Sequence, residues 1–236
     1  MLTITWKKNM DQLQLREREI FNILKVIKKC EFVVIGGYAV NAYALPRFSI
    51  DCDIVVKKQR ELDKIIKELL KLNYKETIKE NNDLPYHGKF YRYGKTLENN
   101  FKVSMDILFN KVLDRQTNAT FESEWIINNS SMKILKGKTI NEELKIRIIN
   151  IDALITMKMI SCRNTDIRDI FMLIPKAESI EWIKEEVSNR YLLKDRIEKI
   201  KETINSKQFK DNLQGVHGYI EQKIFDKHKK AIEELK

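Results

Sequence analysis

The sequence predicts an α/β (α+β) core, a mixed sheet flanked by helices, followed by a C-terminal helical domain. Up to about residue 150, helical periodicity alternates with short β-branched runs that are typical of buried strands. After Asp152, the segments have helical spacing and no strand pattern lies between them. Only seven Gly and three Pro are present, so we see no flexible linker at which to divide the chain. We therefore expect an α/β domain at residues 1–150 and a helical domain at residues 151–236.

The first half is expected to begin with an amphipathic helix that leads into a buried strand. Apolar residues within 8–29 fall mostly on one helical stripe, and the run FVVI that follows ends at two adjacent glycines. The next helical stretch, residues 38–45, should stop at Pro46, because proline does not continue a helix. Residues 49–56 alternate as a strand, and residues 59–72 form a second amphipathic helix.

Shorter extended segments are expected at residues 74–78, 89–93 and 103–109. A β-hairpin is predicted in MKILKGKTI with Gly137 at its bend, and LKIRIINI is a later strand. The stretch YHGKFYRYGK, which includes His87, mixes aromatic and basic residues as a base-stacking surface does, but we favour an exposed hairpin. The stretch NLQGVHGYI, around His217, is either a substrate loop or a turn between helices.

The composition indicates a folded, basic protein. Lys and Arg number 44 against 34 Asp and Glu, which gives a net charge of +10 and favours polyanionic partners. The same bias also arises from base composition or heat tolerance. Cys30, Cys52 and Cys162 are an odd set without CxxC spacing, so neither a disulfide framework nor a zinc site is predicted.

The sequence contains no targeting or membrane signal that we can identify. The N-terminal stretch is charged within its first ten residues, which excludes an ordinary signal peptide. No run approaches the roughly 20 apolar residues that cross a bilayer. We therefore expect a cytoplasmic protein with no membrane partner.

The triplet DCD, within the strand predicted at residues 49–56, carries the first chemical signal. Residues two apart on a strand face the same side, so Asp51 and Asp53 project together and Cys52 faces the opposite side. Two adjacent carboxylates repel each other, and their burial without compensation costs several kcal/mol. A hard divalent cation such as Mg2+ resolves this repulsion, because it prefers oxygen ligands.

The glycine pair Gly36 and Gly37 provides the second signal. Glycines between a strand and a helix let backbone amides approach an anion, and the start of the helix favours phosphate. A metal site beside a phosphate site indicates phosphoryl or nucleotidyl transfer.

The stretch GGYAVNAYALPRFSIDCDIVV resembles the hG[G/S]…DxD motif of the DNA polymerase β-like nucleotidyltransferase superfamily, in which h is apolar. Within that superfamily it is similar to the AbiEii and MenT group. These are nucleotidyltransferase toxins of type IV toxin–antitoxin systems and their stand-alone relatives. The Arg-x-Ser/Thr-x-Asp-x-Asp run that is usual in this group is reproduced by Arg47, Ser49, Asp51 and Asp53.

Two downstream matches extend the resemblance over roughly residues 32–173. KVSMDILF places Asp106 in the apolar-Asp-apolar triplet of the superfamily's third carboxylate. The helix ALITMKMISCRNTDIRDIFML resembles the group's LLxxKLxAxxxRxxxRDxxDL pattern through Lys158, Arg163, Arg168 and Asp169. Met172 departs from that pattern, because the group often has a second Asp there. Asp83 and Asp114 are weaker alternatives to Asp106, with less strand-like flanks.

The resemblance implies roles for these residues. Asp51 and Asp53 are expected to bind two Mg2+ ions that carry a nucleoside triphosphate. Asp106 is expected to complete one metal site and help deprotonate the acceptor hydroxyl. Gly36 and Gly37 are expected to line the phosphates.

Four other residues have more than one interpretation. Lys158 either neutralises the triphosphate as pyrophosphate leaves, or reaches solvent or pairs with Asp169. Arg47 contacts a phosphate or braces the DxD loop, and Ser49 is structural or a lesser nucleotide contact. Arg163 and Asp169 are expected to form an ion pair that holds their helix on the core.

We therefore expect a Mg2+-dependent nucleotidyltransferase that moves a nucleoside monophosphate from an NTP such as ATP to a hydroxyl acceptor. The basic surplus favours RNA as the acceptor, with a tRNA 3′ end the most economical choice, and an antitoxin protein as a partner. The alternative is a non-enzymatic function, in which the protein is a catalytically silent nucleotide- or RNA-binding module of the same fold. A small molecule, such as an antibiotic, or a protein hydroxyl also remains open as the acceptor.

Overall fold

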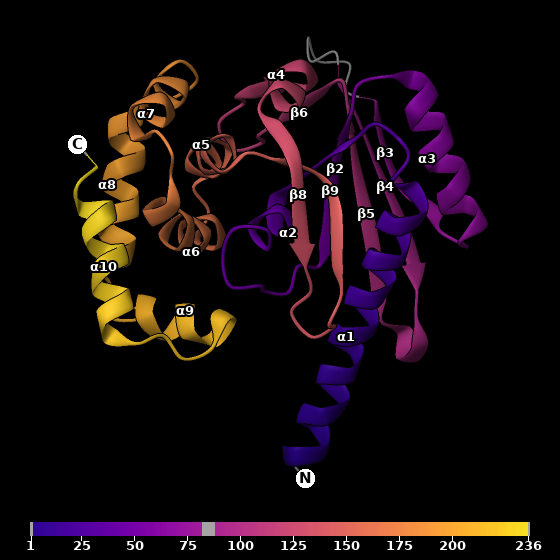
Figure 1. Ribbon diagram of the computed structural model, residues 1–236, viewed down its shortest axis with the longest axis horizontal. Coiled ribbons are helices and arrows are strands. Elements are labelled where there is room, and N and C mark those ends of the chain that lie inside the picture. Colours follow the sequence, from indigo (N-terminus) through magenta and orange to yellow (C-terminus); the bar gives the residue numbers. More distant parts are fainter. Residues whose placement is uncertain (1, 82–87, 236) are drawn as a thin grey trace.

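The computed structural model describes residues 2–81 and 88–235, and these form a mixed β-sheet with helices around it (Figure 1). Seven strands make up the main sheet, in the order β3-β4-β5-β2-β1-β9-β8. The strands of this sheet are β1 (Val33–Ile35), β2 (Asp51–Val56), β3 (Lys75–Asn81), β4 (Lys89–Thr96), β5 (Lys102–Phe109), β8 (Ser130–Lys136) and β9 (Glu143–Ile149). A separate two-stranded sheet consists of β6 (Lys111–Leu113) and β7 (Thr120–Glu122).

Four α-helices lie in the first part of the chain. They are α1 (Leu2–Ile27), α2 (Gly36–Val40), α3 (Gln59–Lys71) and α4 (Ser123–Asn128). From residue 151 onward the described chain is helical. Its α-helices are α5 (Ile151–Ser161), α6 (Asn164–Leu173), α7 (Ile180–Ser188), α8 (Leu193–Ile204), α9 (Phe209–His217) and α10 (Gln222–Glu233). Figure 1 shows α7, α8 and α10 at the opposite end of the molecule from α3 and β3.

The sheet is mixed because β2 pairs in parallel with β5 and β1 pairs in parallel with β9, whereas the other neighbours are antiparallel. β2 and β5 are therefore adjacent and run in the same direction. Each of these strands carries an acidic residue at its centre. The register places Asp53 of β2 directly beside Asp106 of β5.

Helices α1 and α3 cover one face of the sheet. Tyr91 and Tyr93 of β4 are buried on that face, and Lys95 on the same face bonds to Glu19 of α1. Alternation along the strand therefore turns Arg92 and Gly94 toward the opposite face.

The predicted class of fold is confirmed, and several elements differ in extent. The helix expected at residues 38–45 is instead α2, which begins at Gly36 itself and ends at Val40. The hairpin predicted within MKILKGKTI does have Gly137 in its loop, but its second strand is wrong, because β8 pairs with β9 instead of with KTI. LKIRIINI, predicted as a separate late strand, is the partner that completes this hairpin. Three further elements, β6, β7 and α4, were not predicted from the sequence.

The division into two domains at residue 150 stays a prediction. The last strand of the main sheet ends at Ile149, and α5 follows at once. Residues from both predicted parts, such as Gly36 and Lys158, line the same cavities. The three cysteines are free thiols. None of the helices in the described ranges is both long and apolar enough to cross a bilayer.

Candidate active site

Three carboxylates meet at the centre of the sheet. Asp51 and Asp53 lie on the same side of β2, while Cys52 and Ile54 between and beside them are buried in the core. Asp106 lies on the neighbouring strand β5 in register with Asp53. The sequence analysis predicted this grouping, and the parallel pairing of β2 with β5 produces it.

The guanidinium of Arg92 bridges two of these carboxylates. Arg92 Nε donates to Asp106 Oδ1 at 2.7 Å, and Nη2 donates to Asp106 Oδ2 at 2.6 Å. The same Nη2 also donates to Asp51 Oδ2 at 3.0 Å. The bonds to Asp106 and its charge raise the pKa of Arg92 further above its usual value, against the lowering effect of burial. Arg92 therefore neutralises part of the carboxylate cluster.

Asp53 is the carboxylate that Arg92 leaves unpaired. Among the described residues it has no hydrogen-bond or ion-pair partner. Burial, and after it the negative charges of Asp51 and Asp106, raise the pKa of Asp53 to about 8, against the lowering effect of Lys158 and Arg92. A carboxylate in this state gains from a cation nearby, because the cation stabilises its ionised form.

The two glycines allow the start of α2 to approach these side chains. A Cβ atom at Gly36 would lie 2.1 Å from Asp53 Oδ2, and Gly36 has φ +64°, where glycine is favoured. A Cβ atom at Gly37 would lie 2.3 Å from the hydroxyl of Ser49. The first turn of α2 has no side-chain cap, so its amides lack such a partner on the side of Asp53.

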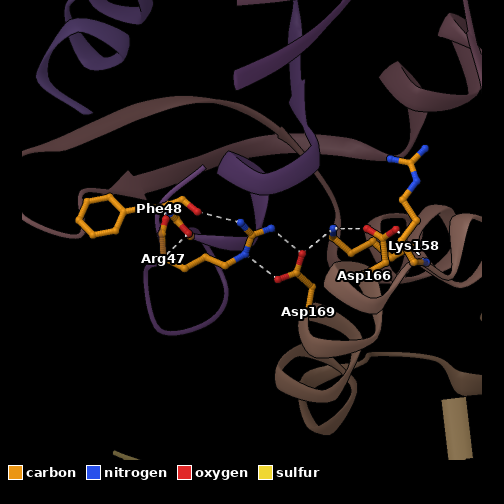
Figure 2. A network of polar contacts seen from close by, with 7 residues as sticks. Arg47, Phe48, Lys158, Asp166 and Asp169 are labelled. Atoms are coloured by element: carbon orange, nitrogen blue, oxygen red, sulfur yellow. Dashed lines mark hydrogen bonds and ion pairs between the residues drawn. The ribbon is translucent and has the colours of Figure 1, made fainter. Parts of the chain in front are cut away.

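Arg47, Asp169, Lys158 and Asp166 form a chain of alternating charges (Figure 2). Arg47 donates to both oxygens of Asp169 at 2.7 Å, so the pair is bidentate. Lys158 lies 2.7 Å from Asp169 Oδ2 and 3.1 Å from Asp166 Oδ1. Burial acts to raise the pKa of Asp169, but Lys158 and Arg47 outweigh it and hold that pKa below its usual value. This chain joins the loop before β2 to helices α5 and α6.

The structure shows protein contacts for two of these residues and corrects one predicted ion pair. Lys158 pairs with Asp169, as one interpretation expected. The predicted ion pair between Arg163 and Asp169 is wrong, because Asp169 faces Arg47 and Lys158 instead. Arg163 stands at the start of α6 and lies 3.7 Å from Asp114. Arg47 braces the loop before β2 by donating to the carbonyl of Phe48.

Two cavities, each of about 360 Å³, meet at the carboxylates. One lies beside the glycines and the charged chain, and its lining includes Gly36, Gly37, Arg47, Ser49, Lys158 and Arg168. The other lies over β4 and β5, and its lining includes Phe90, Arg92, Asp106, Leu113 and Arg115. Asp51, Asp53 and Arg163 line both cavities. A ligand in one cavity and a ligand in the other would therefore face each other across Asp51 and Asp53.

Of the weaker candidates, Asp114 lines a cavity with Asp53 and Lys158, but its carboxylate is already bonded. Asp114 accepts hydrogen bonds from Thr117 and Ser161, which fix its own turn against α5. Asp83 and His87 lie outside the described residues. His217 is buried at the end of α9, and neither of its ring nitrogens has a hydrogen-bond partner among the residues that the structure describes. Met172, which interrupts the helix pattern, is buried in the core.

The carboxylates fit a divalent cation by chemistry but are not arranged around one. Among the described residues, no group of three His, Cys, Asp or Glu side chains is placed to hold a metal ion. The physical reason is the guanidinium of Arg92, which is bonded to Asp51 and Asp106. The unpaired Asp53 and the oxygen donors beside it are the ligand type that Mg2+ prefers.

Arg92 is the residue that the sequence analysis missed. It lies in the stretch KFYRYGK, where Tyr91 and Tyr93 alternate with Arg92 and Gly94. The signal was therefore present: two buried tyrosines place the arginine between them on the other face. Its role could not be seen without the pairing of β4 with β5, which sets Arg92 opposite Asp106.

Comparisons with known proteins agree with this geometry. The family model described as "Nucleotidyl transferase AbiEii toxin, Type IV TA system" matches residues 20–233. No curated protein sequence matches the chain. JHP933 from Helicobacter pylori is similar in structure, with TM-score 0.50 and 15% identity over 95% of this chain and 91% of that one. A candidate nucleotidyltransferase from H. pylori has TM-score 0.52 and 14% identity over 95% of this chain and 94% of its own.

Proposed function

We propose that this chain, which belongs to the AbiEii family of nucleotidyltransferase toxins of type IV toxin–antitoxin systems, transfers a nucleoside monophosphate from an NTP to RNA in the presence of Mg2+. Membership of the family supports the general reaction, which is nucleotidyl transfer. The metal, the acceptor and the residue roles are our proposals. The observation that carries them is the meeting of two cavities at Asp51 and Asp53, beside Asp106.

The cavity beside α2 is proposed to hold the triphosphate. The amides at Gly36 and Gly37 would donate to phosphate oxygens, although α2 is only five residues long and adds little dipole. Lys158 has three N–H donors, of which two point to Asp166 and Asp169. Its remaining donor would neutralise the charge that develops as pyrophosphate leaves. Arg47 would act through Asp169, by holding α6 in place, and Ser49 would position Gly37 and the loop.

The cavity over β4 and β5 is proposed to receive the acceptor. Asp51, Asp53 and Asp106 would hold Mg2+, which when bound supplies neutralisation of the phosphates and a lower pKa for the acceptor hydroxyl. Asp106 would accept the proton of that hydroxyl, since it lies on the side of this cavity. Arg92 must first release Asp106, because both oxygens of that carboxylate accept from it.

RNA is proposed as the acceptor because the protein carries a net charge of +10, and the tRNA 3′ end is the proposed site of transfer. The family also supports an antitoxin as a partner, and we propose that both act in the cytoplasm. A small upstream neighbouring gene that encodes a winged-helix protein would support the toxin assignment.

The acceptor is tested by incubating the protein with each [α-32P]NTP, Mg2+ and either tRNA, ribosomal RNA or total protein. We expect label in tRNA, and none in tRNA whose 3′ diol has been destroyed with periodate. An Asp51→Asn plus Asp53→Asn variant serves as the inactive control. Label that enters protein or a small molecule would contradict the RNA acceptor. Equal label with wild type and control would contradict the reaction itself.

A further inference from the structure

A third cavity, of about 720 Å³, lies over β3, β4 and β5 beside the carboxylate cluster. Arg92 lines both this cavity and the one that we assign to the acceptor. The cavity therefore lies next to the candidate active site, with Arg92 between the two. None of its described lining residues is acidic, and the basic members of the lining are Lys75, Arg92, Lys95 and Lys102.

Strand alternation shows which of these basic side chains face the cavity. Lys95 points to the covered face, because it bonds to Glu19 of α1 at 2.8 Å and lies over the ring of Tyr74. Lys75 is in register with Gly94, and Lys102 is two residues before Ser104, so both lie on the face of Arg92. Two lysines and Arg92 thus remain for the open face.

Register also fixes how far these lysines lie from the reacting centre. Lys75, Gly94, Ser104 and Asp51 occupy one row across β3, β4, β5 and β2. At a strand spacing of about 4.8 Å, Lys75 lies about 14 Å from Asp51. Between them stand Gly94 and Ser104, and the side chain of Thr77 lies over Gly94, where a Cβ atom would be 3.2 Å from the Thr77 methyl group.

Lys75 and Lys102 are exposed, and neither has an ion-pair partner among the described residues. The ammonium group of an exposed lysine without a carboxylate partner is available to bind a phosphate, and it does so as a compact positive charge. Two such charges stand on a surface that leads to the carboxylates. A chain with regularly spaced phosphates and a terminal hydroxyl matches this arrangement, because its phosphates lie upstream of the end that reacts.

From this arrangement we infer that the open face of β3, β4 and β5 binds the sugar-phosphate backbone of the acceptor RNA. Lys75 and Lys102 contact phosphates upstream of the 3′ end, and the terminal nucleotide reaches Arg92 and Asp106. The inference rests on the proposed function, since it assigns a path to the acceptor of that reaction. It adds a site that the carboxylate motif does not contain.

The test measures binding of a fluorescein-labelled RNA hairpin with a single-stranded 3′ end by anisotropy, without NTP. The protein carries Asp51→Asn and Asp53→Asn, so that no transfer occurs. A Lys75→Glu plus Lys102→Glu variant should raise Kd at least about tenfold at moderate salt. A Lys75→Gln plus Lys102→Gln variant should raise it less, and should lower the slope of log K against log salt by about two.

The matched control is Lys223→Glu plus Lys227→Glu on α10. Both lysines are exposed, and α10 lies at the other end of the molecule from β3 (Figure 1). This control has the same net charge as the first variant, and its Kd should change less than about twofold. Equal weakening in the two charge-reversal variants would overturn the inference, because it would show attraction by net charge alone.

Three further results separate this inference from the proposed function. RNA that binds through Lys75 and Lys102 but is never labelled by the active protein would support the site and contradict RNA as acceptor. RNA that is labelled and bound normally by the lysine variants would overturn the site and leave the reaction standing. Displacement of the RNA by polyglutamate at equal charge concentration would assign the surface to acidic polypeptides and also overturn the inference.

Discussion

Two short hydrogen bonds join the guanidinium of Arg92 to the carboxylate of Asp106, at 2.7 Å from Nε and 2.6 Å from Nη2. The second of these nitrogens also reaches Asp51. A protein side chain thus provides the positive charge beside two of the three acids to which we assign the metal. Under the proposed function, a divalent ion held by these acids would take the place of this guanidinium.

Removal of Arg92 should destabilise the metal-free protein. Arg92→Ala leaves Asp106, which is only 5% exposed, without its partner. Since Arg92 itself is 34% exposed, we expect a loss of about 1–3 kcal/mol in the free energy of unfolding rather than more. Urea denaturation in EDTA measures this loss. Added Mg2+ should then raise the midpoint more for Arg92→Ala than for wild type, because the ion replaces the missing charge.

Arg60→Ala is the matched control for this experiment. Arg60 is 80% exposed, and its partner Glu61 also pairs with Lys64, so the removal of Arg60 should change stability by less than about 0.5 kcal/mol. If Arg92→Ala is as stable as wild type in EDTA and Mg2+ stabilises it no more than wild type, the proposed replacement of the Arg92 guanidinium by a divalent ion is contradicted.

Asp169 should be a large contributor to the packing of α6. Its side chain is 1% exposed and balances both Arg47 and Lys158. Asp169→Asn keeps the shape but leaves two buried cations, and we expect a loss of about 3–5 kcal/mol. Asp166→Asn, which weakens the more distant contact to Lys158 and the bond from the Arg163 N–H that caps α6, should cost less. Similar losses of stability for the two variants in urea denaturation would contradict the central place of Asp169 among these charged side chains.

Gly36 should tolerate no side chain. Gly36→Ala places a Cβ atom 2.1 Å from Asp53 Oδ2 at a positive φ, so Asp53 must move and strain of about 1–2 kcal/mol is added. A displacement of the reacting groups by about 1 Å lowers activity by roughly a hundredfold. Gly215→Ala in α9 is the control, because a Cβ atom there meets nothing within 4 Å. Unchanged label transfer by Gly36→Ala would argue against the close approach of α2 to Asp53.

His217 should make the protein acid-sensitive. Burial lowers the pKa of His217 to about 4, against a usual value near 6.5. Because the unfolded chain binds the proton more readily, stability is lost as pH falls through this interval, by up to about 1.4 kcal/mol per pH unit. His217→Phe should remove the contribution of this histidine to the pH dependence of the free energy of unfolding. The wild type should therefore lose more stability than the variant between pH 7 and pH 5. Parallel curves in thermal or urea unfolding would contradict the assignment.

Much of this site was predictable, because its signals are local. The alternation in DCDIVV sets both acids on one face of the strand. The two glycines directly follow β1, so the strand that precedes them already predicts their place at the start of a helix. Asp106 was predicted from its apolar flanks in KVSMDILF, which mark a buried strand.

The residues that were missed or misassigned depend on contacts between distant segments. Arg92 meets Asp106 only because β4 pairs with β5, and no local pattern fixes that register. Asp169 was paired with Arg163 because they share a helix motif, whereas its partner Arg47 is 122 residues away. The small sheet of β6 and β7 was missed because each of its strands has only three residues.

The central claim is that Asp51, Asp53 and Asp106 support transfer of a nucleotide with release of pyrophosphate. The most direct measurement follows two labels in parallel reactions with tRNA and Mg2+. With [α-32P]NTP the RNA should become labelled, with [γ-32P]NTP the label should leave as pyrophosphate, and Asp53→Asn or Asp106→Asn should reduce both by at least about 10²–10³-fold. Transfer of the γ label to the RNA, or wild-type rates in the Asp variants, would contradict the account.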